Sequence, residues 1–119
     1  MTAFPLEKYR HQTEQALDQF DMRGRELFLM KEAQAFFDAH TPKEPISLGR
    51  EREGSVCLER DGLLLAVYFS ERGGKNLIAL FDYVVNALDY LAAKYLDIPK
   101  LPLDWVALNQ AFDRQRPIA

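Results

Sequence analysis

The segment Arg72-Gly73-Gly74-Lys75 contains residue types that could bind an anion. Two cations flank two glycines between an apolar run and a predicted helix that begins at Asn76. Backbone amides at a strand-to-helix junction attract anions, and neighbouring cations strengthen that attraction. The glycine spacing of nucleotide-binding loops is missing from the segment. It therefore predicts either an anion-binding site at Arg72, Gly73, Gly74 and Lys75 or a flexible turn with solvated charges.

A line of polar residues interrupts the most apolar stretch of the chain. Asp82, Asn86 and Asp89 recur at spacings of four and three, which places them on one side of a helix. Their carboxylates could meet a cationic partner or a metal, or they could keep an exposed helix edge in water. Tyr83 and Tyr90 border this line, and tyrosine is enriched at protein interfaces. These five residues are the candidates for a partner-binding surface.

The other groups of polar or reactive residues do not favour a metal site, a cofactor site or a catalytic centre. Glu7, His11, Glu14 and Asp18 share a helical face opposite the apolar one, which is typical of a solvated surface. Cys57 is the only cysteine, which excludes an internal disulfide and a zinc site built on paired cysteines. No sequence neighbour activates its thiol, so we expect an inert, packed side chain. Catalytic motifs are missing, which favours a protein that is not an enzyme.

The N-terminal part of the chain predicts two amphipathic helices. Apolar residues recur at helical spacing over Pro5–Phe20 and again over Glu26–His40. The two apolar faces differ in direction by roughly 160°, and Gly24 lies between them. We therefore expect a break near Gly24, with a single helix over residues 5–40 as the alternative.

The middle of the chain predicts a three-stranded antiparallel meander. Its strands are Ile46–Leu48, a run that begins at Val56, and Leu63–Phe69. Asp61-Gly62 between the last two is typical of a two-residue hairpin turn. The strand Leu63–Phe69 is apolar at every position, as expected for a central strand covered on both faces.

The C-terminal part predicts a long helix over Asn76–Asp97 and a short last helix over Leu103–Asp113. The long helix carries a four-three apolar seam made of Leu77, Phe81, Val84, Leu88, Leu91 and Tyr95. Such a helix is either the centre of the domain or shared with a second copy. We expect one α+β domain over residues 1–119: two N-terminal helices, the meander, this central helix and the short helix. We also expect a homodimer formed through the central helix or the N-terminal pair.

Composition and charge exclude several classes of protein. Among 119 residues, 48% are hydrophobic and 28% charged, the balance of an ordinary globular protein. The net charge of -3 and the alternation of arginine with glutamate over residues 50–53 argue against binding nucleic acid. The start of the chain does not resemble a signal peptide, and no apolar run is long enough to cross a membrane. We expect a cytoplasmic protein.

These observations favour a small non-enzymatic protein-interaction module, such as an adaptor, a chaperone-like partner or an immunity-type inhibitor. The alternative is a small-molecule-binding or enzymatic domain, with a pocket between sheet and helices and an anion held by Arg72 and Lys75. A deep pocket with converging polar groups would favour the alternative. An exposed apolar patch bordered by charge would favour the interaction module.

Overall fold

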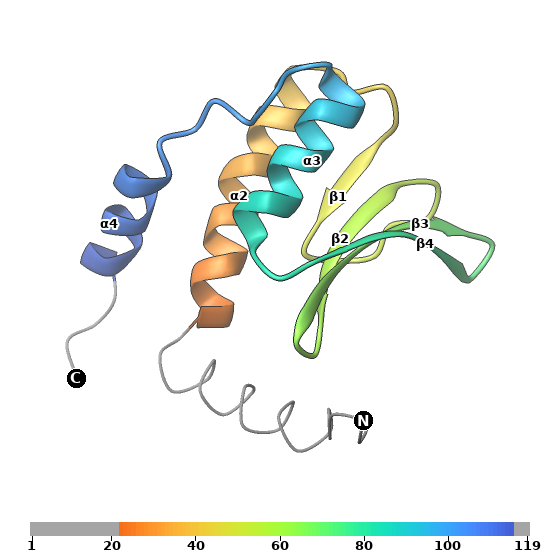
Figure 1. Cartoon of the computed structure of the whole chain (residues 1–119), viewed down its shortest axis with the longest axis horizontal. Coiled ribbons are helices and arrows are strands. Elements are labelled where there is room, and N and C mark those ends of the chain that lie inside the picture. The colour runs from red at the N-terminus through yellow and green to blue at the C-terminus, as the bar shows by residue number, and fades with distance from the viewer. Residues whose placement is uncertain (1–21, 116–119) are drawn as a thin grey trace, which may run out of the picture.

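The computed structural model of the chain describes residues 22–115, which form three helices and one four-stranded sheet (Figure 1). In chain order the elements are α2 (Met22–Ala39), β1 (Ile46–Leu48), β2 (Val56–Asp61), β3 (Leu64–Glu71), β4 (Gly74–Phe81), α3 (Val84–Leu96) and α4 (Trp105–Gln115). Helices α2 and α3 lie side by side against one face of the sheet, and α4 packs on α2 (Figure 1). The helix predicted over Pro5–Phe20, with its acidic stripe, lies outside the described residues.

Within residues 22–115 the N-terminal region holds one helix, α2, which begins at Met22 and includes Gly24 in its first turn, so the predicted break does not lie at Gly24 itself; the residues before Met22 lie outside the described part. A glycine inside a helix costs only about 1 kcal/mol. Leu29, Met30, Ala33 and Phe37 recur at spacings of three and four and are all buried against the sheet and α3. The packing of this stripe outweighs the weak local preference at Gly24.

Strand β1 runs parallel to β2, so the predicted antiparallel meander is also wrong. Residues 49–55 carry the chain back to the start of β2 across the sheet face that lacks α2 and α3. On that face the backbone N–H of Arg52 donates to the Cys57 sulfur at 3.4 Å, and Cys57 is completely buried. Adjacent strands joined by a short link are usually antiparallel, because a parallel connection normally needs a longer crossover.

The hairpin predicted around Asp61 and Gly62 is present, but its turn is shifted by one residue. Asp61 still pairs with Leu64, so the turn consists of Gly62 and Leu63. Gly62 has a φ of 63°, a conformation that glycine adopts without steric cost.

A second hairpin joins β3 to β4 where the sequence predicted a strand-to-helix junction. Glu71 pairs with Gly74, and the two turn residues Arg72 and Gly73 have φ values of 50° and 78°. Positive φ at both central positions is typical of the tight turns that reverse a strand. Arginine rarely adopts this conformation, so its presence at the first turn position hid the hairpin from a reading of the sequence.

The long helix predicted over Asn76–Asp97 is therefore wrong in its first part. Residues up to Phe81 belong to β4, and α3 begins only at Val84. A continuous apolar run such as residues 77–81 fits helix and strand periods equally well, and pairing with β3 decides between them. The predicted helix-helix seam therefore loses Leu77 and Phe81 to β4, and the expected homodimer stays a prediction.

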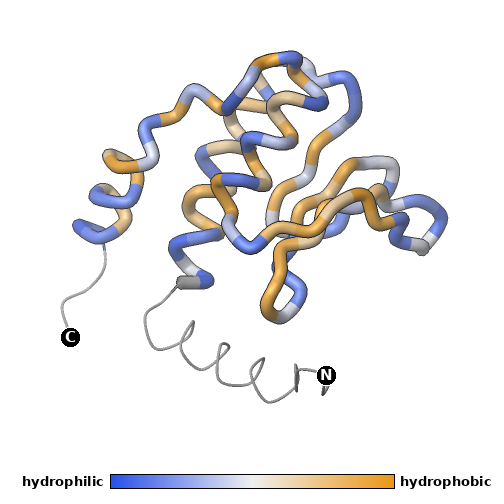
Figure 2. The backbone as a smooth tube through the Cα atoms, in the orientation of Figure 1, coloured by the Kyte–Doolittle hydropathy of each residue, from blue (hydrophilic) through white to orange (hydrophobic). Residues whose placement is uncertain are grey.

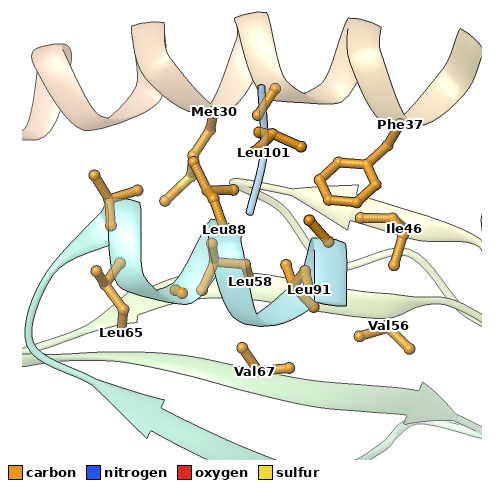
Figure 3. Close-up of a cluster of buried hydrophobic side chains, with 14 of the residues drawn as sticks. Met30, Phe37, Ile46, Val56, Leu58, Leu65, Val67, Leu88, Leu91 and Leu101 are labelled. Atoms are coloured by element: carbon orange, nitrogen blue, oxygen red, sulfur yellow. The ribbon is translucent and has the colours of Figure 1, made fainter. Parts of the chain in front are cut away.

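The hydrophobic core lies between the sheet and the two helices (Figure 3). Its completely or almost completely buried side chains include Phe37, Val56, Leu58, Leu65, Val67, Leu88, Leu91 and Leu101. Apolar residues also continue along β4 toward α3 (Figure 2). Ile78, Ala79 and Phe81 pack against this core, whereas Leu77 and Leu80 are exposed and need a separate explanation.

Candidate functional site

Strand β4 forms one edge of the sheet and pairs with β3 alone. It is eight residues long, contains no proline, and carries a single charged residue, Lys75. Within residues 22–115, no other strand pairs with its outer side. Such an edge keeps a row of backbone N–H and C=O groups available for an added strand.

The opposite edge of the sheet is closed by a side chain. Gln34 on α2 donates from Nε2 to the Ile46 carbonyl at 2.9 Å, and its Oε1 accepts from the Leu48 N–H at 2.8 Å. The amide of Gln34 therefore takes the place of a neighbouring strand along the short β1. Among residues 22–115, the β1 edge is thus protected and the β4 edge is open.

A β-bulge directs two leucines of β4 to the same face. In the register with β3, Leu77 lies opposite Tyr68. Leu80 lies opposite Ala66, because Ile78 is the extra residue of the bulge. Tyr68 and Ala66 belong to a small cluster separate from the main core, on the face away from α2 and α3. Without the bulge, residues three apart would point to opposite faces.

The exposed residues of β4 and of its link to α3 form one surface. Leu77 is 61% exposed, Leu80 is 49% exposed, and Tyr83 is 70% exposed. Lys75 and Asp82, both exposed, carry opposite charges near the two ends of the strand. We refer to Lys75, Leu77, Leu80, Asp82 and Tyr83 as the β4 surface.

Tyr68 on β3 is buried next to this surface, opposite Leu77. Its hydroxyl donates to the Glu59 carboxylate, and the Lys75 ammonium lies 4.9 Å from the centre of its ring. Burial raises the pKa of Tyr68, and the hydrogen bond to the Glu59 carboxylate raises that pKa further. The phenol therefore stays protonated and acts as a fixed hydrogen-bond donor that holds Glu59 in place.

The protonated state of Tyr68 predicts a loss of stability at alkaline pH. Above the ordinary tyrosine pKa of about 10, the unfolded chain loses the phenol proton while the folded chain keeps it. The Tyr68 phenol should then lower the free energy of unfolding by up to about 1.4 kcal/mol for each pH unit above this pKa. Tyr68→Phe should abolish this contribution to the pH dependence. Denaturant unfolding between about pH 9 and pH 11 measures the difference. An unchanged pH dependence in Tyr68→Phe would contradict this assignment.

The structure does not bring together the five residues predicted as a partner-binding surface. Asp82 and Tyr83 lie in the link between β4 and α3, and Asn86 is exposed on α3. The Asp89 carboxylate accepts a hydrogen bond from the Leu101 N–H at 3.0 Å, so it anchors the segment that follows α3. Tyr90 is half-buried against Phe81, with the ring centres 5.2 Å apart. Only Asp82 and Tyr83 belong to the β4 surface.

The four residues predicted as an anion site also have a different setting. Arg72 and Gly73 form a turn between two strands, and Gly74 and Lys75 begin β4. No helix begins here, so the helix amides that motivated the anion site are not at this position. The two cations instead make one end of the β4 edge basic.

The space between sheet and helices, where the alternative function placed a ligand pocket, is filled by side chains. Phe37, Leu58 and Leu88 occupy it and are completely buried. A groove of about 430 Å³ lies outside this region, between α2 and the β1–β2 loop. Its lining includes Leu27, Lys31, Gln34, Leu48, Arg50 and Arg52. This groove is peripheral and open, unlike the deep pocket that the alternative requires.

The sequence reading missed Leu77 and Leu80 as surface residues, because it placed them in a buried helix. The adjacent glycines 73 and 74, a few residues after the end of the strand predicted over Leu63–Phe69, were the available signal for a hairpin. The bulge at Ile78 has no comparable local signal.

Comparison of the chain with protein-family models, with curated proteins and with solved structures finds no match. Among residues 22–115, no helix has both the length and the apolar character needed to cross a membrane. Within the same residues, no three histidine, cysteine, aspartate or glutamate side chains gather as a metal site would require. The β4 surface therefore has to be interpreted from its own geometry.

Proposed function

We propose that this chain is a protein-interaction module whose β4 edge binds an extended polypeptide segment. The observation that carries the proposal is the open edge of β4, with Leu77 and Leu80 exposed beside it. A segment added along this edge would form main-chain hydrogen bonds with β4, and its alternate side chains would contact the two leucines. The backbone supplies affinity in this mode, and the side chains supply specificity.

The contrast between the two sheet edges supports this proposal. Proteins usually protect edge strands by shortness, proline, charge or a covering side chain. β1 has three residues and is covered by Gln34, whereas β4 has eight residues and one charge. Lys75 and the bulge at Ile78 are protective features of β4, but the bulge also gathers the two leucines on one face. An edge that exposes leucines is a liability unless a partner covers it.

The shape of the surface favours a polypeptide over a small molecule. A strand of eight residues spans about 27 Å, which matches an extended segment rather than a compact ligand. Leu77 and Leu80 lie on an open sheet face instead of inside a cavity. We place this module in the cytoplasm, because its single cysteine is a free thiol and can form no internal disulfide.

A random peptide library displayed on phage tests the proposal when it is panned on the protein immobilised at low density. We expect enriched peptides with alternating apolar residues, and we expect Leu77→Lys to weaken their binding by about tenfold or more. Val106→Lys is the matched control, because Val106 is 69% exposed on α4, outside the β4 surface. Peptides that bind Leu77→Lys as well as the unmodified protein, or no enrichment at all, would contradict the proposal.

A further inference from the structure

We propose that the segment which pairs with β4 is the β4 strand of a second copy of this chain, an inference that rests on the function proposed above. The two strands would run antiparallel about a two-fold axis normal to the sheet. The four strands of each copy would then join in one continuous sheet.

The positions of the two leucines suit this symmetry. A two-fold axis normal to the sheet keeps each face on its own side, so side chains on the open face of one copy meet those of the other. Leu77 and Leu80 share that face because of the bulge at Ile78. Pairing would therefore gather four leucines into one apolar patch across the seam. A β4 strand without the bulge would place one leucine of each copy on the opposite face.

The charges at the two ends of β4 favour the antiparallel direction. The hairpin end carries Arg72 and Lys75 against Glu71, and is therefore net positive. The end toward α3 carries Asp82. Antiparallel overlap of the two strands places Lys75 of each copy near Asp82 of the other, whereas parallel overlap would bring like charges together. The charges of two β4 strands are therefore complementary in the antiparallel arrangement and not in the parallel one.

Sedimentation equilibrium over a dilution series tests this inference on the full chain. We expect a reversible dimer with a dissociation constant on the order of micromolar, because a single strand pair makes a small interface. The variant with both Leu77→Lys and Leu80→Lys should be a folded monomer, since both side chains are exposed. Val106→Lys should dimerise like the unmodified protein, and a cooperative thermal unfolding transition would verify that each variant is folded.

Charge reversal tests the direction of pairing. Lys75→Glu alone and Asp82→Lys alone should each weaken self-association by about fivefold or more, and more strongly at low salt. A mixture of the two single variants should pair with opposite charges at both ends and recover the affinity. Recovery in the double variant supports antiparallel pairing between copies, because parallel overlap of that variant would still bring like charges together.

The outcomes separate this inference from the proposed function. A protein that stays monomeric at the highest concentrations but selects peptides through Leu77 would overturn the inference and retain the function. A dimer that is insensitive to Leu77→Lys with Leu80→Lys would overturn the inference, because its interface would lie elsewhere. A dimer that both single charge variants leave unaffected would overturn the antiparallel arrangement.

Discussion

Replacing Arg60 by leucine is expected to lower the free energy of unfolding by about 3 kcal/mol. The guanidinium Nε and Nη2 of Arg60 each donate to one Glu26 carboxylate oxygen at 2.6 Å. The two side chains are only 16% and 12% exposed, so the variant would leave the poorly hydrated Glu26 carboxylate without its bidentate partner. This pair joins α2 to the end of β2, which makes it a link between the helix layer and the sheet.

Chemical denaturation of variants measures this effect. Changing both residues together, Glu26→Leu with Arg60→Leu, should recover most of the lost stability, because no buried charge is then left unpaired. Lys43→Leu is the matched control, since the pair of Lys43 with Asp97 is more than half exposed and should contribute no more than about 1 kcal/mol. A loss in Arg60→Leu no larger than that in Lys43→Leu would show that the pair is solvated.

Replacing Leu88 by alanine is expected to destabilise the protein by about 2–5 kcal/mol. Leu88 on α3 is completely buried among side chains from α2 and the sheet (Figure 3). The substitution removes apolar contacts and leaves a cavity that the close-packed core cannot fill.

Leu80→Ala provides the matched control for Leu88→Ala. Leu80 is 49% exposed at the sheet edge, so its truncation in the monomer should change the free energy of unfolding by less than about 1 kcal/mol. The comparison is made at a concentration below the dissociation constant expected for the proposed dimer. Equal effects of the two substitutions would contradict the assignment of Leu88 to the core and of Leu80 to the surface.

Local signals in the sequence were sufficient to predict some of the helices and strands. The hairpin at Asp61 and Gly62 follows from turn chemistry between two apolar runs, and α4 follows from the helical spacing of Trp105, Leu108 and Phe112. The α+β character of the chain follows from the same signals. Each of these features depends on neighbours within a few residues.

The remaining features depend on contacts between distant residues. The parallel direction of β1 rests on a loop that crosses the sheet and packs Arg52 over Cys57. The strand character of residues 76–81 rests on pairing with β3, because their apolar run fits a helix equally well. Periodicity alone could reveal neither arrangement.

In the candidate site, too, some residues could be predicted from local signals and others depend on contacts between distant residues. Asp82 and Tyr83 stood out by residue type and are exposed at one end of β4. Leu77 and Leu80 became surface residues only through the register with β3 and the bulge at Ile78. The protected edge at β1 likewise depends on Gln34, which is separated from its strand partners by a helix end and a loop. Edges and faces are properties of the assembled sheet.

The claim that the β4 edge is where this chain pairs with another strand is tested most directly by amide hydrogen exchange at low and high protein concentration. We predict that amides of residues 74–81 gain protection as concentration rises, while amides of α4 do not change. The variant with Leu77→Lys and Leu80→Lys should show no such gain. Protection that appears in α4 or α2 and leaves residues 74–81 unchanged would contradict the claim.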